Sequence, residues 1–159
     1  MGTVFLFLDF DGVLHPVGTP ALAEDFTLLD NPELFCFLSI LEEILAPYSN
    51  VRIIVSSDWR RLFDDETLIR LLGGLGPRFE GIVECYNQVR ATEISHEAQR
   101  RSLSYWIALD DHPSVVQAAI LDKRFVPTNA KLGISDPVTQ SVLQAVLTRI
   151  TKDLCSPIE

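Results

Sequence analysis

Three short runs of apolar residues, each followed at once by polar side chains, constrain the fold of this 159-residue chain most strongly. The runs cover residues 4–8, 51–55 and 105–109. Continuous apolar runs of this length are typical of strands that are buried on both faces of a parallel sheet. Segments with helical patterns separate them, and this alternation predicts an α/β fold with helices on both faces.

The other elements are predicted from the residues that flank them. A helix is expected from Asn31, its cap, to about residue 46, because Pro47 would end it there. Ser135 is expected to cap a last helix that ends near residue 150. The remaining pattern indicates helices or short strands over residues 64–72, 79–86, 91–101, 114–121 and 124–126.

Composition narrows the class of protein. Hydrophobic residues make up 47% of the chain and charged residues 22%, which predicts one globular domain over residues 1–159. The formal net charge of -9 disfavours extended, non-specific binding to nucleic acid. No apolar run reaches the roughly 18 residues of a membrane span, and neither a signal-peptide pattern nor a C-x-x-C pair occurs. We therefore expect a cytoplasmic protein with reduced thiols and no membrane partner.

Polar residues follow each apolar run, at the point where the predicted strand ends. The carboxyl ends of parallel strands meet at one edge of a sheet, where ligands bind in α/β folds. If the three strands are neighbours, their polar residues therefore converge on one crevice. These residues are Asp9, Asp11, Ser56, Ser57, Asp110 and Asp111.

Four carboxylates at one sheet edge repel one another unless a cation offsets their charge. Ligands that are all oxygen favour Mg²⁺, which also binds substrate phosphates. Asp9 is then a candidate metal ligand and nucleophile, and Asp11 a candidate proton donor and later base. Gly12 permits a tight turn close to a ligand, and Ser56 offers its hydroxyl and backbone N–H to a phosphate oxygen.

These motifs resemble those of the haloacid dehalogenase-like (HAD) superfamily of phosphatases and phosphotransferases. DFDGV at 9–13, VSS at 55–57 and ALDD at 108–111 are similar to its first, second and fourth motifs, in the same order. The resemblance implies a Rossmann-like three-layer sandwich with a central, mostly parallel sheet. It also implies a Mg²⁺-dependent phosphohydrolase that acts through an aspartyl-phosphate intermediate.

The resemblance assigns the metal site to the side chains of Asp9, Asp110 and Asp111 and to the backbone carbonyl of Asp11. Asp111 is favoured over Asp110 as the closer ligand. Gly12, Ser57 and Arg60 are expected to contact the substrate.

The third motif of the superfamily is a lysine or arginine, and no lysine precedes Lys123 in this chain. Arg90 is assigned to this role because it lies just before the helix expected at 91–101. An arginine can hold phosphate oxygens in a bidentate manner. The rival candidates are Arg60, Arg100 and Arg101.

The intervals after the first and second motifs are too short for a full cap domain, so the chain resembles the capless HAD type. Capless members often act on macromolecular phosphates or use a neighbouring subunit to cover the site. A homodimer is therefore one possible state of this chain. The segments DFDGVLHP, SSDWR and WIALDDH are also similar to capless domains associated with nucleic-acid end repair. The expected substrate is a phosphorylated small molecule or a nucleic-acid end. Whether residues 13–30 close over the site stays open.

Other interpretations stay open as well. Without the usual lysine, the chain could be a non-catalytic HAD-fold binding or scaffold module. A receiver-like phosphoacceptor domain is a weaker alternative, because it would need its phosphoacceptor Asp on the third strand and a late lysine. One of Asp110 and Asp111 could cap the next helix. His15 is expected to be structural or solvated, and Trp59 either packs against the next helix or stacks on a base.

Overall fold

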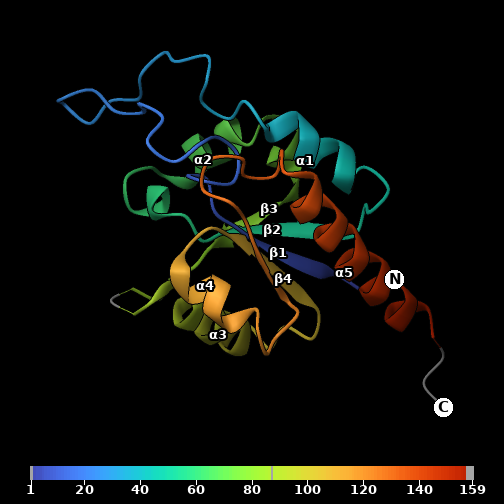
Figure 1. Cartoon of the computed structure of the whole chain (residues 1–159). Helices are drawn as coiled ribbons and strands as arrows, with labels where there is room; N and C mark the ends of the chain where they lie inside the picture. Colours follow the sequence, from blue (N-terminus) through green and yellow to red (C-terminus); the bar gives the residue numbers. More distant parts are fainter. Residues whose placement is uncertain (1, 87, 157–159) are drawn as a thin grey trace.

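The computed structural model describes residues 2–86 and 88–156, and its centre is a five-stranded sheet (Figure 1). All strand pairs are parallel, and the strand order is β3-β2-β1-β4-β5. The α/β fold predicted from the apolar runs is confirmed, with the first run at the centre of the sheet. The strands are β1 (Val4–Leu8), β2 (Val51–Val55), β3 (Phe79–Ile82), β4 (Trp106–Asp110) and β5 (Phe125–Pro127).

Helices cover both faces of the sheet, which confirms the three-layer arrangement (Figure 1). Alternate residues of a strand point to opposite faces, so β1 contributes Leu6 and Leu8 to one core and Phe7 to the other. The first core also contains residues of α1, α2 and α5, and the second contains residues of α3 and α4. The helices are α1 (Leu38–Leu45), α2 (Asp65–Leu71), α3 (Arg90–Arg100), α4 (Pro113–Ala118) and α5 (Pro137–Cys155).

The register of the three central strands aligns their carboxyl ends. Leu8 of β1 is paired with Val55 of β2 on one side and with Leu109 of β4 on the other. The next residues, Asp9, Ser56 and Asp110, therefore lie side by side. This is the convergence expected from the parallel topology.

The helix expected from Asn31 is wrong at its start, because α1 begins only at Leu38. The Asn31 side chain accepts a hydrogen bond from the Glu33 N–H at 3.0 Å and forms a local turn in place of a helix cap. Phe35 then adopts a left-handed backbone conformation (φ 57°). Its ring packs edge-on against Phe10 and Trp59, so tertiary packing overrides the local helix-start signal.

Two expected helix caps also differ from the structure. The cap of α5 is Asp136, not Ser135: its carboxylate accepts a hydrogen bond from the Val138 N–H at 3.0 Å, and the helix continues to Cys155. The cap of α4 is His112, whose ring accepts from the Ser114 N–H. Asp110 and Asp111 therefore do not cap α4.

The intervals after β1 and β2 contain no separate cap domain within the described residues. The first interval is a loop that projects from the body of the molecule (blue in Figure 1), and its only regular pairing there is isolated bridges such as Leu22 with Leu28. The second holds α2 and two 3-10 turns, η1 (Asp58–Arg61) and η2 (Gly73–Arg78). Across the described part of the chain, we find no helix with the length and apolar character needed to cross a membrane.

Candidate active site

Three carboxylates gather at the carboxyl edge of the sheet and form what we call the carboxylate cluster: Asp9, Asp110 and Asp111. One oxygen from each lies within 4.8 Å of the others. Asp9 and Asp110 are buried, and Asp111 is partly buried. Burial, reinforced by the charge of Asp110, raises the pKa of Asp9 well above its usual range. Burial likewise raises the pKa of Asp111.

Arg90, the first residue of α3, reaches into this cluster. Its Nη1 lies 2.8 Å from Asp110 Oδ2 and 3.3 Å from Asp9 Oδ1, and its Nη2 lies 3.2 Å from Asp58. Burial opposes the charged guanidinium, but Asp110 and Asp9 outweigh it and hold the pKa of Arg90 above its usual value. The structure thus brings the predicted cation to the predicted carboxylates. The rivals Arg100 and Arg101 instead pair with Glu97.

The donor set fits Mg²⁺. The three side chains offer only oxygen, the ligand that Mg²⁺ prefers, and one guanidinium cannot offset three carboxylates. The side chain of Asp11 lies outside the cluster, since hydrogen bonds turn it toward His15 and Trp59. A contribution of Asp11 to the metal through its backbone carbonyl stays a prediction.

Two side chains orient the Asp11 carboxylate. His15 Nε2 lies 2.7 Å from Oδ1, and the Trp59 indole N–H donates to Oδ2 at 2.9 Å. His15 Nδ1 accepts from the Phe35 N–H at 3.2 Å, so Nε2 carries the ring proton and donates it to Asp11. Partial burial raises the pKa of Asp11, but these hydrogen bonds outweigh it and hold that pKa below its usual value.

The Asp11 side chain is nevertheless 44% exposed, whereas His15 is fully buried. Asp11 can therefore exchange a proton with a bound molecule while its partners fix its direction. The sequence carried a weak signal for His15, which lies four residues after Asp11, and none for Trp59, which is 48 residues away. His15 has the structural role expected for it, and Trp59 both packs and donates to Asp11.

The two serines after β2 have different surroundings. The Ser56 hydroxyl is buried and finds no hydrogen-bond partner among the residues that the structure describes. Such a group costs about 1–3 kcal/mol unless a ligand satisfies it, so it is suited to a phosphate oxygen. We expected the Ser56 backbone N–H to bind a phosphate oxygen. It instead donates to Leu8 O at 3.0 Å and is not free to do so. The Ser57 hydroxyl accepts a hydrogen bond from the backbone N–H of Trp59 and caps η1.

Arg60 lies behind these serines and does not face the carboxylate cluster. Its Nη1 donates to Ser56 O at 2.6 Å and to Ser57 O at 3.1 Å, and its Nη2 donates to Glu93 at 2.9 Å. The side chain is fully buried. These contacts give Arg60 a structural role, holding the turn after β2 against α3, in place of the expected substrate contact. Glu93, its buried partner, had no sequence signal.

Gly12 is placed against the carboxylate cluster itself. Its φ of 74° lies in the left-handed region, and a Cβ there would overlap the carboxylate of Asp111. Its carbonyl accepts a hydrogen bond from Thr128 Oγ1 at 2.7 Å. Gly12 therefore makes room for Asp111, a different role from the substrate contact that we expected.

Gly12→Ala is expected to displace Asp111 and to weaken Mg²⁺ binding. The control is Gly18→Ala: Gly18 also has a positive φ (83°), but a Cβ at this position would meet no atom within 4 Å, so it shares only the backbone strain of about 1–2 kcal/mol. Thermal unfolding with and without Mg²⁺ checks this. We expect the Mg²⁺-induced rise in Tm to be lost in Gly12→Ala and kept in Gly18→Ala; an equal rise in both variants would contradict it.

A family model described as the HAD domain in Swiss Army Knife RNA repair proteins matches residues 5–138. The chain belongs to this family. The match runs from β1 into the start of α5 and contains the carboxylate cluster of this HAD domain, together with Asp11, Ser56 and Arg90. No curated protein and no solved structure matches the chain.

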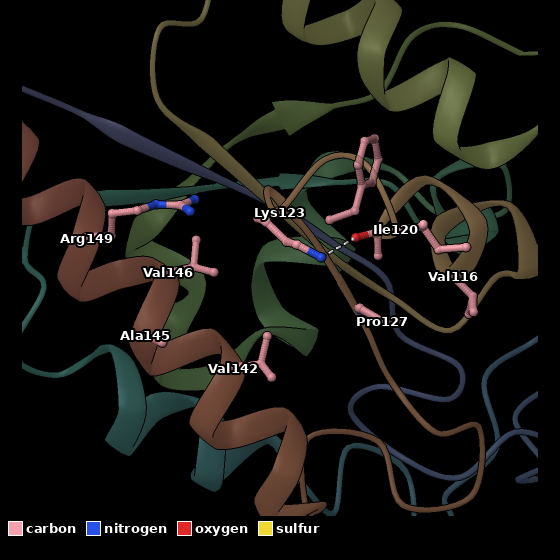
Figure 2. Close-up of a pocket in the computed structure, with 10 residues that line it drawn as sticks. Val116, Ile120, Lys123, Pro127, Val142, Ala145, Val146 and Arg149 are labelled. Atoms are coloured by element: carbon pink, nitrogen blue, oxygen red, sulfur yellow. Dashed lines mark hydrogen bonds between the residues drawn. The ribbon is translucent and has the colours of Figure 1, made fainter.

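A cavity of about 610 Å³ lies elsewhere in the HAD domain, between α4, β5 and α5 (Figure 2). Its lining is mostly apolar, with Val116, Ile120 and Val142 on its walls and Lys123 and Arg149 beside them. None of the predicted site residues lines this cavity. The carboxylate cluster, with Arg90 and Asp11 beside it, therefore stays the candidate active site.

Proposed function

We propose that this HAD domain is a Mg²⁺-dependent phosphomonoesterase that forms an aspartyl-phosphate on Asp9. The observation that carries the proposal is the position of the Asp9 carboxylate, held between Arg90 and two further acids in a buried cluster whose ligands are all oxygen. Mg²⁺ held by Asp9, Asp110 and Asp111 would offset the negative charge of these acids and of the phosphoryl oxygens.

In the first step, an Asp9 oxygen attacks phosphorus, and the bond from phosphorus to the ester oxygen breaks. The released electron pair stays on the leaving oxygen, which takes a proton from the carboxylic acid form of Asp11. The negative phosphoryl group beside Asp11 favours that protonated form when the substrate is bound. Arg90 and the Ser56 hydroxyl donate hydrogen bonds to the phosphoryl oxygens.

In the second step, water attacks phosphorus and gives a proton to the Asp11 carboxylate. The bond between phosphorus and Asp9 breaks, which releases inorganic phosphate and restores the Asp9 carboxylate. The hydrogen bonds from His15 and Trp59 hold the Asp11 carboxylate in one orientation while it takes this proton. One carboxylate thus serves as acid and then as base.

The position of Arg90 favours this proposal over a non-catalytic scaffold, since the scaffold alternative rested on a missing motif-three lysine. Arg90 contacts both Asp9 and Asp110 and can supply that charge. A receiver-like domain would need a late lysine beside the acids. Lys123 donates to Ala119 O and lines the cavity of Figure 2. Among the described residues, the ion pairs of these acids are made by Arg90, and none joins them to Lys123, Lys131 or Lys152.

Hydrolysis of a generic aryl phosphate by the purified chain, with Mg²⁺ and with a chelator, tests the proposal. We expect steady turnover with Mg²⁺, complete loss with the chelator, and recovery when Mg²⁺ is restored. Turnover that the chelator leaves unchanged would contradict the metal-dependent mechanism.

Trp59→Phe is expected to slow esters of poor leaving groups more than esters of acidic phenols. The variant removes one of the two donors that orient Asp11, and general acid catalysis, worth about 10²–10⁴-fold, matters most when the leaving alcohol is weakly acidic. The measurement is kcat for an alkyl and an aryl phosphate. Asp11→Asn, which removes the acid altogether, sets the largest loss that we expect. Trp106→Phe, a buried tryptophan in the other core, is the control. A uniform loss on both esters would refute the orienting role.

The family description concerns RNA repair proteins, so a phosphorylated RNA end is one substrate to consider for this chain beside small phosphomonoesters. The residues around Asp11 bear on the choice between these two substrate classes.

A further inference from the structure

We propose that the alcohol released by this HAD domain is a small, uncharged and largely apolar molecule that binds in a cavity beside Asp11. The inference rests on the proposed phosphomonoesterase function and specifies the substrate class. Nothing in the family description assigns this cavity a role.

The cavity has a volume of about 420 Å³, within the range of small-molecule sites. Its apolar lining comes from Val17, Ala21, Leu22, Trp59 and Leu62. Two of these side chains are open to an incoming molecule, since Val17 is 52% exposed and Leu62 is 50% exposed. The cavity is therefore accessible and mostly apolar.

The leaving group has to lie in this cavity because the acid must be within hydrogen-bond reach of the leaving oxygen. Asp11 lines the cavity, and its neighbour Trp59 donates to the same carboxylate. A second cavity, of about 260 Å³, opens beside Arg90 and Arg61, but Asp11 does not line it. The ester oxygen and the alcohol that carries it therefore belong on the Asp11 side.

The outer wall of this cavity is held in place by hydrogen bonds. The Val17 N–H donates to Ala130 O at 2.8 Å, and Asn31 Nδ2 donates to Pro20 O at 2.9 Å. Residues 17–22 thus form a fixed wall of the leaving-group cavity, while the tip of the same loop, with Phe26 71% exposed, projects away (Figure 1).

The ionisable side chains that line the cavity are both acidic. They belong to Asp11 and Asp58, and no lysine or arginine is among the described residues that line it. Asp58 is paired with two arginines, Arg90 at 3.2 Å and Arg60 at 3.4 Å, so its charge is offset. Asp11 is in its carboxylic acid form when it donates to the leaving oxygen, so it is uncharged at that stage. An anionic group placed here would exchange water for an apolar lining that offers it no cation, which we expect to lower kcat/KM on the order of tenfold. A nucleic-acid strand, with a phosphodiester after its terminal nucleoside, is disfavoured for the same reason.

The test compares two phosphate esters whose phenols are similarly acidic but differ in charge: 4-methylphenyl phosphate and 4-(carboxymethyl)phenyl phosphate. We expect kcat/KM to be about tenfold higher for the uncharged leaving group. Leu62→Lys adds a cation to the cavity and should remove most of this preference. Leu62→Met, of similar size, and Val142→Lys, in the cavity of Figure 2, should retain it.

The outcomes separate the inference from the function on which it rests. Equal kcat/KM for the two esters, or a preference that Leu62→Lys does not change, would overturn the inference and leave the phosphatase intact. A short oligonucleotide with a terminal phosphate that is hydrolysed as fast as the uncharged ester would also overturn it. If wild-type protein with Mg²⁺ hydrolyses neither ester, the proposed function fails, and the inference fails with it.

Discussion

Asp9→Asn is expected to reduce turnover of a phosphomonoester by on the order of 10⁴-fold or more, because the amide cannot act as the nucleophile. The same change should not lower the free energy of unfolding in Mg²⁺-free buffer. Asp9 lies in a buried cluster with Asp110 and Asp111, and burial together with these charges disfavours its ionised form. An amide of nearly the same shape removes that charge, so we expect stability and activity to separate.

Steady-state kinetics and chemical denaturation of the same preparation measure both effects. Asp153→Asn, on the exposed surface of α5, is the control and should change neither quantity. Metal-dependent turnover that survives in Asp9→Asn would rule out Asp9 as the nucleophile. An unfolded variant would show that the cluster needs this carboxylate for stability.

Arg90→Met is expected to have the largest effect on stability, lowering the free energy of unfolding by about 3–5 kcal/mol in Mg²⁺-free buffer. The arginine is buried and is the cation that contacts both Asp9 and Asp110, so its removal leaves those acids uncompensated. Added Mg²⁺ should restore part of the lost stability, since it binds the same carboxylates. Turnover should fall by at least about 10²-fold, because a donor to the phosphoryl oxygens is lost.

Urea denaturation with and without Mg²⁺ checks this prediction, with Arg149→Met as a control on the exposed face of α5. Arg90→Lys keeps the charge but cannot reach Asp9, Asp58 and Asp110 through two nitrogens, so we expect an intermediate stability. If Arg90→Met were as stable as wild type without Mg²⁺, the ion pairs would not hold the cluster together.

The features that could be predicted from sequence are those that repeat along the strands. Each apolar run indicates a buried strand, and parallel pairing brings the residues after the runs to one edge. This reasoning was sufficient for Asp9, Ser56 and Asp110, which follow aligned positions of β1, β2 and β4. Arg90 was chosen through the family resemblance, which places the third-motif cation just before the helix expected at 91–101.

The features that were missed depend on contacts between distant segments. Arg60 was expected to contact the substrate, but its burial and its pairing with Glu93 depend on the packing of α3 against the turn after β2. The helix expected from Asn31 was displaced because Phe35 packs against Trp59. Similarly, the indole donor to Asp11 comes from a residue 48 positions away. No local pattern carries these tertiary contacts.

Identification of the phosphorylated residue tests the central claim most directly. Wild-type protein is mixed with a phosphomonoester and Mg²⁺, quenched in acid within the first turnovers, and digested for mass spectrometry. We expect one phosphoryl group on Asp9, more of it in Asp11→Asn because that variant lacks the base for hydrolysis, and none in Asp9→Asn. Phosphate on a different residue, or turnover in wild type with no phosphorylated Asp9 in either the wild type or Asp11→Asn, would contradict the account.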